Sequence, residues 1–359
     1  MVLIAFRDIF LASFGIMQRM QFEIITDFDQ IQETEWDGLL SNSSFDSPFL
    51  RYGYQRAWWG YKGGGEWPRA ELRVITARQD GTLTGIAPLF VGEKDGKKEM
   101  LFIGSIEISD YLDFIVQPEN AKAFIFGVLD LIADNQDMFP PDLRLVNLPD
   151  ASPSGEILKA VRRQDGWDIQ ISNAYHTPKI PLAEDWDTYL AGIDKKQRHE
   201  IRRKIRRAEG AEEDQVGWYI TDLESSYPAD GDAFLGLMDN DEAKAKFLEA
   251  PMRDQMREIM DWAANSGYLQ LSFLTVNGKK AAGYLCLDYG DRIWVYNSGY
   301  APGFRYYSPG WVLLGYLIQK AIADGKRYFD FMRGDEEYKY RFGAEDSFVL
   351  QAIGKLTRS

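Results

Sequence analysis

Hydrophobic and polar residues alternate along four short runs of this chain, and the runs form two pairs. They are residues 71–78 and 83–91, and residues 269–276 and 281–289. Asp80-Gly81 separates the first pair, and Asn277-Gly278 separates the second, 197 residues later. Such dipeptides tolerate the positive φ values of a tight turn, so the pattern predicts two β-hairpins.

The elements predicted around each hairpin also follow one order. In the first half they are helices at 29–40 and 48–61, strands at 99–103 and 111–116, a helix at 120–134 and a strand at 143–148; in the second half, a strand at 292–299, a helix at 309–323 and a strand at 328–332. Residues 126–150 and 311–335 share a helix–strand–acid layout at a spacing of 185. We therefore predict a duplicated α/β unit with mixed sheets and a hinge within residues 172–181.

The predicted domains are residues 21–175 and residues 176–359. Residues 1–20 are interpreted as an N-terminal extension that is either disordered or begins at a misplaced start. Their uncharged apolar run, residues 9–17, has about half the length that spans a bilayer. It also lacks a basic segment before it, which argues against a signal peptide.

Charge is distributed unevenly along the chain. The net charge of −14 argues against a general nucleic-acid binder. Residues 195–207, however, carry eight Lys or Arg residues against the single acid Glu200, so this segment is +7 and the remainder is −21. Ile201 and Ile205 give the segment one narrow apolar stripe, which predicts a basic helix within residues 195–209. We expect it to meet an anionic partner.

Cysteine and histidine are scarce. Cys286 is the only cysteine and there are two histidines. An intrachain disulfide is excluded, which fits a reducing, cytoplasmic compartment. A zinc site of the usual Cys/His type is not expected, and we predict no metal.

The two copies differ where the chain enters the apolar helix. The first copy enters through Val116-Gln117-Pro118-Glu119, which ends on an acid, and the second through Tyr307-Ser308-Pro309-Gly310, with Arg305 nearby. Unpaired N–H groups and the helix dipole make a helix start a seat for an anion such as pyrophosphate. The sequence thus predicts this seat in the second copy, with no cofactor in the first.

The second half resembles the GNAT acyltransferase superfamily, and in particular the acetyltransferase domain of CelD-type and FemAB-like proteins. The motifs that carry the resemblance are Trp294 to Tyr300, Ser308-Pro309-Gly310, Phe329-Asp330-Phe331, Gly334-Asp335-Glu336 and Tyr338-Lys339-x-Arg341-Phe342, with the basic helix at Lys196 to Arg203 before them. In the first half, Pro48-Phe49, Trp58-Trp59 and Gly85 to Leu89 resemble the same family.

This resemblance implies an α/β fold of two tandem GNAT-like domains. It implies acetyl-CoA or another acyl-CoA as donor, or aminoacyl-tRNA in the FemAB branch. The acceptor would be an amine or hydroxyl of a small molecule, sugar, peptide or lipid, in cell-envelope or exopolysaccharide synthesis. One departure is the donor loop, which is reduced here to residues 305–310.

Four residues are candidates for catalysis on this interpretation. Asp330, buried among aromatic residues, would have a raised pKa and act as general base; the alternative is a structural acid paired with Arg333 or a backbone N–H. Asp335 and Glu336 would meet substrate just past the strand end, or form a solvated turn. Tyr338 would return a proton to the leaving thiolate, or pack as a core aromatic.

The remaining candidates are binding residues. The donor would contact Asn297, Ser298, Arg305, Tyr307, Ser308, Pro309 and Gly310. Arg198, Arg202 and Arg206 share one ridge of the basic helix and would bind an anionic acceptor or a membrane surface, unless the chain's acids neutralise them. Lys339 and Arg341 would bind phosphate or pair with Asp335 and Glu336.

Three functions stay open. The first is an acyl-CoA-dependent N-acyltransferase, in which the acceptor amine attacks the thioester directly. The second is aminoacyl transfer from tRNA, which the basic helix permits and the acidic body disfavours. The third is a non-catalytic module that binds an envelope precursor.

Overall fold

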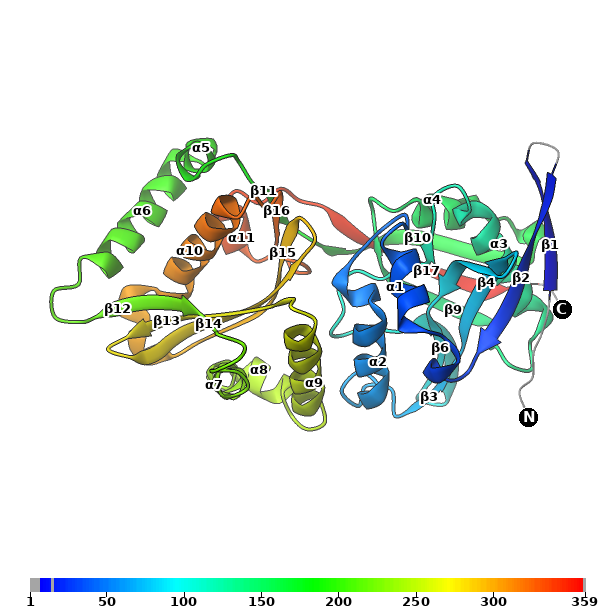
Figure 1. The fold of residues 1–359 in the computed structure, drawn as a ribbon, viewed down its shortest axis with the longest axis horizontal. Coiled ribbons are helices and arrows are strands. Elements are labelled where there is room, and N and C mark those ends of the chain that lie inside the picture. The colour runs from blue at the N-terminus through cyan, green and yellow to red at the C-terminus, as the bar shows by residue number, and fades with distance from the viewer. Residues whose placement is uncertain (1–6, 14–15, 358–359) are drawn as a thin grey trace. The chain divides into compact units, whose positions relative to one another are not determined.

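The computed structural model describes residues 7–13 and 16–357, with side chains from Met20 onward. The chain divides into two compact units, each with its own sheets (Figure 1). Unit 1 comprises Met1–Tyr175 and Phe348–Ser359, and unit 2 comprises His176–Ser347. Mixed sheets with helices on their faces give the α/β class that the sequence predicts.

Unit 1 contains two sheets, with strand orders β1-β2-β4-β5-β8 and β10-β17-β9-β7-β6-β3. The strands are β1 (Arg7–Ser13), β2 (Ile16–Ile25), β3 (Arg69–Leu72), β4 (Val74–Gln79), β5 (Thr82–Ala87), β6 (Leu89–Lys94), β7 (Lys97–Phe102), β8 (Ile115–Val116), β9 (Asp142–Pro149), β10 (Trp167–His176) and β17 (Phe348–Leu356). The helices are α1 (Glu33–Leu40), α2 (Tyr52–Tyr61), α3 (Ala121–Asp134) and α4 (Pro153–Ala160), with short 3₁₀ turns η1 (Phe28–Gln30), η2 (Pro48–Leu50) and η3 (Arg163–Asp165).

The first and last described strands, β1 and β17, both belong to the sheets of unit 1. Strand β17 pairs antiparallel with β9, which assigns it to unit 1 although the sequence placed it in the second domain. The pairing explains the difference, because a strand belongs to the sheet that satisfies its backbone groups. Within the predicted extension 1–20, residues 7–13 and 16–20 belong to β1 and β2; residues 1–6 and 14–15 lie outside the described residues.

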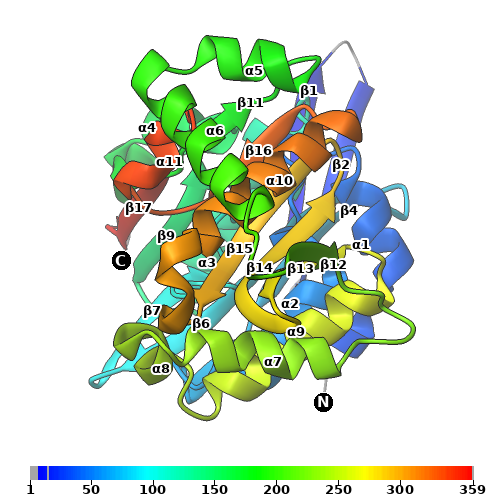
Figure 2. The ribbon, with the colours of Figure 1, turned by 90° about the vertical axis from the view of Figure 1, so that its left-hand side faces the viewer.

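Unit 2 has one sheet of order β11-β16-β15-β14-β13-β12. Its strands are β11 (Lys179–Pro181), β12 (Val216–Ile220), β13 (Leu269–Val276), β14 (Lys279–Tyr289), β15 (Arg292–Tyr300) and β16 (Tyr328–Asp330), and its helices are α5 (Trp186–Gly192), α6 (Lys195–Glu209), α7 (Ala229–Met238), α8 (Glu242–Phe247), α9 (Met252–Asn265), η4 (Pro302–Tyr307), α10 (Pro309–Ala323) and α11 (Glu337–Arg341). Helices α6 and α10 cover one face of the sheet, and α7 and α9 cover the other (Figure 2).

Many of the predicted elements are confirmed. The hairpin turns adopt positive φ at Asp80 (48°) and Asn277 (50°), and each is followed by a glycine that also has positive φ. The basic helix is α6, and α10 has the predicted bounds. The predicted strand 328–332 ends early, at Asp330, because Met332 adopts a left-handed conformation with φ 54°. The predicted strand 111–116 shortens to β8.

Strands β15 and β16 separate soon after they begin. They run parallel and pair over three positions only, from Arg292↔Tyr328 to Trp294↔Asp330. Strand β15 then continues to Tyr300, while β16 stops. An irregularity in the pairing of β14 with β15, between Leu285 and Cys286, lies at the same level. The separation leaves a gap beside the second half of β15.

Candidate active site

A cavity of about 200 Å³ occupies the gap beside β15. Its walls come from β14, β15, α10 and α11, and the lining residues are Tyr284, Ser298, Gly299, Tyr300, Gly310, Trp311, Leu314 and Tyr338. The lining is largely aromatic and apolar, and its hydroxyl-bearing residues are Tyr284, Ser298, Tyr300 and Tyr338. Three residues predicted from the sequence, Ser298, Gly310 and Tyr338, therefore meet around one cavity, which we call the splay cavity.

The first turn of α10 opens onto the splay cavity. Pro309 has no N–H, and the Val312 amide donates to the Ser308 carbonyl. The amides of Gly310 and Trp311 are left without an acceptor inside the helix. A Cβ atom on Gly310 would meet nothing within 4 Å, so the space beside the Gly310 Cα is open. The helix start thus has two amides without an intrahelical acceptor, and anion binding there stays a prediction.

Arg207, which the sequence analysis did not include among the binding residues, reaches the same helix start from α6. Its Nη2 donates to Ser308 Oγ at 2.9 Å, and its guanidinium lies 5.1 Å from the Tyr306 ring centre. Its buried Nε has no hydrogen-bond partner among the described residues. The contact of Arg207 with Ser308 depends on the packing of α6 on α10, which the sequence does not show. Gly315 permits that packing, since a Cβ there would lie 3.1 Å from Ile205 Cδ1.

The other two residues of the predicted donor loop lie differently. Tyr307 is buried, and its hydroxyl donates a hydrogen bond to Asp214 that raises the pKa of Tyr307 to about 12. Its ring therefore anchors the loop. Arg305 is exposed on η4, near the same helix start in sequence.

Asn297 turns away from the splay cavity and is held by a lysine of α8. Lys244 Nζ donates to Asn297 Oδ1 at 3.0 Å and also to the Ser298 carbonyl. Burial lowers the pKa of Lys244, and the negative charges of Asp241 and Glu336 act in the opposite direction. Lys244 thereby fixes the end of β15. No sequence pattern singles it out, because α8 is far from β15 along the chain.

Asp330 is fully buried, as predicted, and it has the backbone N–H partner of the structural alternative together with Arg292, which was not expected. Its Oδ2 accepts from Arg292 Nη1 at 2.8 Å, and its Oδ1 accepts from the Met332 amide at 2.8 Å. The Arg292 guanidinium lies 4.6 Å from the Trp294 ring centre. Both carboxylate oxygens are thus engaged. This placement favours the structural alternative, and proton transfer by Asp330 stays a prediction.

The residues of the predicted acidic turn divide between surface and core. Asp335 and Glu336 are exposed. Lys339 is buried; its Nζ pairs with Glu336 at 2.8 Å and donates to the carbonyls of Arg333 (2.8 Å) and Gly334 (3.1 Å). Lys339 therefore stabilises the turn. Of its two predicted roles, phosphate binding or pairing with an acid of the turn, the structure shows the pairing with Glu336. Tyr338, next to it, is mostly buried, and burial raises its pKa, so it carries its proton at neutral pH.

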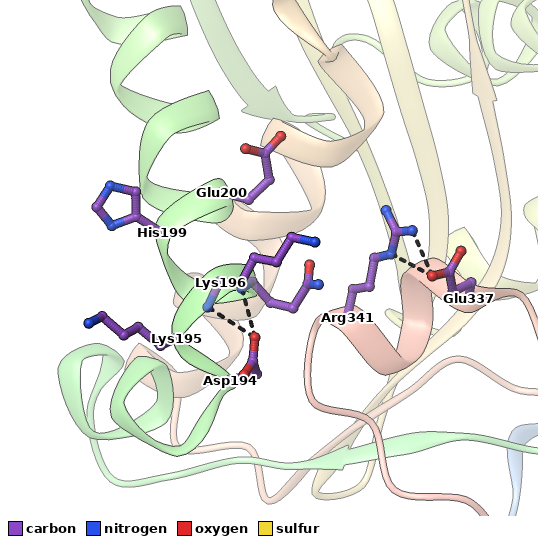
Figure 3. A pocket seen from close by; sticks show the side chains of 8 residues that line it. Asp194, Lys195, Lys196, His199, Glu200, Glu337 and Arg341 are labelled. Carbon is purple, nitrogen blue, oxygen red and sulfur yellow. Dashed lines mark hydrogen bonds and ion pairs between the residues drawn. The ribbon is translucent and has the colours of Figure 1, made fainter.

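The predicted arginine ridge of α6 does not form one free surface. Arg198 donates to the carbonyls of Leu190 (3.3 Å) and Ala191 (3.2 Å), which end α5. Arg202 contacts the exposed Asp187 at 3.3 Å, and Arg206 is exposed. Arg341 pairs with Glu337 at 2.6 Å and lines a separate groove of about 890 Å³ between α6 and α11 (Figure 3).

The described part of the chain has neither a metal-binding cluster nor a membrane-spanning helix. No group of three or more His, Cys, Asp or Glu side chains is arranged to hold a metal ion there. None of the helices described combines the length and apolarity needed to cross a bilayer.

Comparison with known proteins agrees with this geometry. Residues 195–340 match the model of the family described as acetyltransferase (GNAT) domain. The fold is similar to that of FemX (TM-score 0.64, 11% identity, 91% of this chain and 96% of that one). It is also similar to L-PGS from Bacillus licheniformis (TM-score 0.52, 10% identity, 89% and 91%). No curated protein matches by sequence.

A third similar structure is a C-terminal domain assigned to a lysylphosphatidylglycerol synthetase of Agrobacterium fabrum (TM-score 0.54, 10% identity, 88% and 91%). These identities are low, so the likeness concerns the fold. Residues 195–340 thus match the GNAT domain family model, and the mixed α/β fold of the chain is similar to that of these solved structures.

Proposed function

We propose that unit 2 is an N-acyltransferase that takes its acyl group from acetyl-CoA or another acyl-CoA. The observation that carries this proposal is the continuity between the splay cavity and the open start of α10. A thioester donor has an uncharged, extended arm followed by a pyrophosphate. The cavity suits the arm, and the amides of Gly310 and Trp311, with the Arg207 guanidinium, suit the pyrophosphate.

The reaction would be direct attack of an acceptor amine on the thioester carbonyl. The carbon–nitrogen bond forms as the carbon–sulfur bond breaks, the amine loses a proton and the thiolate leaves. Tyr338 lines the cavity and carries its proton at neutral pH, so it is the proposed donor to the departing sulfur. The exposed Glu336 is the proposed acceptor of the amine's proton.

Calorimetry with acetyl-CoA tests the donor site. Gly310→Asp places a carboxylate beside the free amides, so the affinity should fall more than about hundredfold by charge repulsion and loss of the seat. Gly310→Ala is the matched control, because a Cβ meets nothing within 4 Å, and it should change the affinity less than about threefold. Unchanged acetyl-CoA affinity in Gly310→Asp would show that the start of α10 does not bind the pyrophosphate. Release of free thiol with an amine acceptor then tests turnover.

Aminoacyl transfer from tRNA is the second candidate, and the exposed cations of α6 favour it. Arg206 and Lys196 are exposed on this helix and carry no ion pair within the described residues. A filter-binding assay with charged tRNA decides between the two. Retention of charged tRNA, without any stabilisation by acetyl-CoA, would replace the acyl-CoA proposal. Absence of both would favour a non-catalytic binding module.

A further inference from the structure

The groove between α6 and α11 lies apart from the splay cavity and has no part in the donor site. It is lined by Asp194, Lys195, Lys196, Gln197, His199, Glu200, Glu337 and Arg341. In Figure 3, Lys196 extends from α6 toward Arg341 of α11, whereas Lys195 and His199 extend from the other side of the helix. Two cations from different elements thus flank one volume of about 890 Å³.

The carboxylates of the groove are already engaged. Asp194 caps α6 by accepting from the amides of Lys196 (2.9 Å) and Gln197 (3.3 Å). Glu200 pairs with Arg203, whose hydrogen bonds lower the pKa of Glu200 to about 2. These acids therefore remain charged but have donors of their own.

The cations are less fully matched. Glu337 Oε1 accepts from two nitrogens of Arg341, Nε and Nη2, which leaves the Nη1 side of the fork. The Lys196 ammonium has no ion pair among the described residues, and it is exposed. The α6 wall of the groove consequently carries the unpaired charge of Lys196, and the α11 wall offers the remaining N–H donors of Arg341, which suits a phosphate or carboxylate held between a lysine and an arginine.

Helix α11 connects the groove with the proposed chemistry. Tyr338 lines the splay cavity, while Glu337 and Arg341, four residues apart on the same short helix, line the groove. A ligand anchored in the groove would therefore lie on the opposite side of one helical turn from the donor cavity. We propose that the groove binds the anionic group, phosphate or carboxylate, of the acceptor, between Lys196 and Arg341. This inference rests on the proposed acyltransfer.

Inorganic pyrophosphate is the first probe, used in the Gly310→Asp background so that the donor seat does not contribute. Binding that persists in this background belongs elsewhere than α10. Lys196→Gln should then weaken it about tenfold, the usual loss for one charge-assisted hydrogen bond. Lys279→Gln is the matched control, since Lys279 is exposed at the start of β14 and does not line the groove, and should weaken binding less than about twofold. Absence of binding in the Gly310→Asp background, or equal losses in the two lysine variants, would overturn the proposal.

The second experiment separates an acceptor site from a site for free anions. Acyl transfer is measured to glucosamine and to glucosamine 6-phosphate. Lys196→Gln should raise KM for the phosphorylated amine about tenfold, with kcat unchanged, and leave KM for glucosamine unaltered. If KM changes equally for both, the groove does not hold the acceptor's anion. If the wild-type protein does not bind acetyl-CoA, the proposed acyltransferase function is rejected. This outcome is distinguishable from failure of the groove proposal, which concerns KM for the phosphorylated amine.

Discussion

The two units use the space after their parallel strand pair in different ways. In unit 1, β7 pairs with β9 through Met100↔Leu143, and the segment after β7 then lies beside the later part of β9. The Leu112 amide donates to the Asn147 carbonyl at 2.9 Å, and Asn147 Nδ2 donates to the Ser109 carbonyl at 2.6 Å. In unit 2, β15 leads directly into η4 and α10, and the splay cavity remains.

The helices that follow differ in the same sense. Phe124 of α3 packs so closely on β5 that a Cβ on Gly85 would lie 2.4 Å from its ring. Phe124 also contacts Phe22 and Phe114, with ring centres 5.9 and 6.3 Å apart. At the start of α10, by contrast, Gly310 faces open space and Arg207 supplies a cation. Duplicating the scaffold thus does not duplicate the site, because a site also needs space that the chain does not fill itself.

The buried acids of the two units sharpen this comparison, and the largest expected effect concerns Asp330. Asp330→Asn leaves the guanidinium of Arg292 without its charge partner, so we expect unit 2 to lose about 3–5 kcal/mol of stability. Hydrogen exchange of the β16 amides measures this loss. Arg292→Met is the matched variant. If Asp330 is also the general base, its substitution lowers turnover of the folded enzyme far more than Arg292→Met does.

The next effect tests whether the open cavity is the reaction site. Tyr338→Phe should lower kcat about hundredfold, since proton donation to the thiolate is lost, with acetyl-CoA affinity unchanged. Steady-state kinetics and calorimetry give the two quantities. Tyr340→Phe on the same helix is the control; the Tyr340 hydroxyl bonds Asp346 at 3.2 Å, away from the cavity lining. Equal effects of the two variants would remove Tyr338 from the mechanism.

In unit 1, the buried carboxyl of Asp113 predicts a pH-dependent stability. Burial raises the pKa of this carboxyl from 3.8 to about 6, although hydrogen bonds from Ser152, Ser154 and the Phe114 amide oppose the shift. Because the pKa of Asp113 is higher in the folded state than in the unfolded state, the protonated carboxyl favours folding. Its contribution to the free energy of unfolding is present at about pH 4 and is lost as the pH rises through about 6. We expect unit 1 to lose about 2 kcal/mol over this window.

Asp113→Asn tests that assignment because the amide does not ionise. Urea unfolding followed between pH 4 and pH 7 should show a weaker decline with pH in the variant than in the wild type. Parallel curves for the two proteins would mean that Asp113 is not the group responsible.

The smallest expected effect concerns the cation that distinguishes the two helix starts. Arg207→Gln should lower acetyl-CoA affinity about tenfold through loss of one charge-assisted contact. Arg203→Gln is the control on the same helix, because Arg203 pairs with Glu200 at 2.8 Å and does not reach α10. Calorimetry that finds the same change in both variants would show that general helix charge, not the position of Arg207, sets the affinity.

Local pattern was sufficient for much of the fold. The hairpin dipeptides, the apolar helix at 309–323 and the basic helix are each encoded by neighbours in sequence, and each is confirmed. The sequence patterns placed the residues of β17 in the second domain, and they predicted no helix at α7, α8 or α9. A strand's sheet depends on a partner distant in sequence, and β17 pairs with β9 about two hundred residues earlier. The left-handed Met332 that ends β16 has no signal in its residue type.

For the site, the sequence by itself determined that a helix with an open, acid-free start follows a strand, and that acids and Tyr338 follow the next strand. These are local facts of residue type and order. Only the tertiary structure decided that Arg292 forms an ion pair with Asp330, that Lys244 donates hydrogen bonds to the end of β15 and that Arg207 donates one to Ser308. The reason is physical: an ion pair or a cavity depends on which side chains converge in space, and convergence is set by packing between elements far apart along the chain.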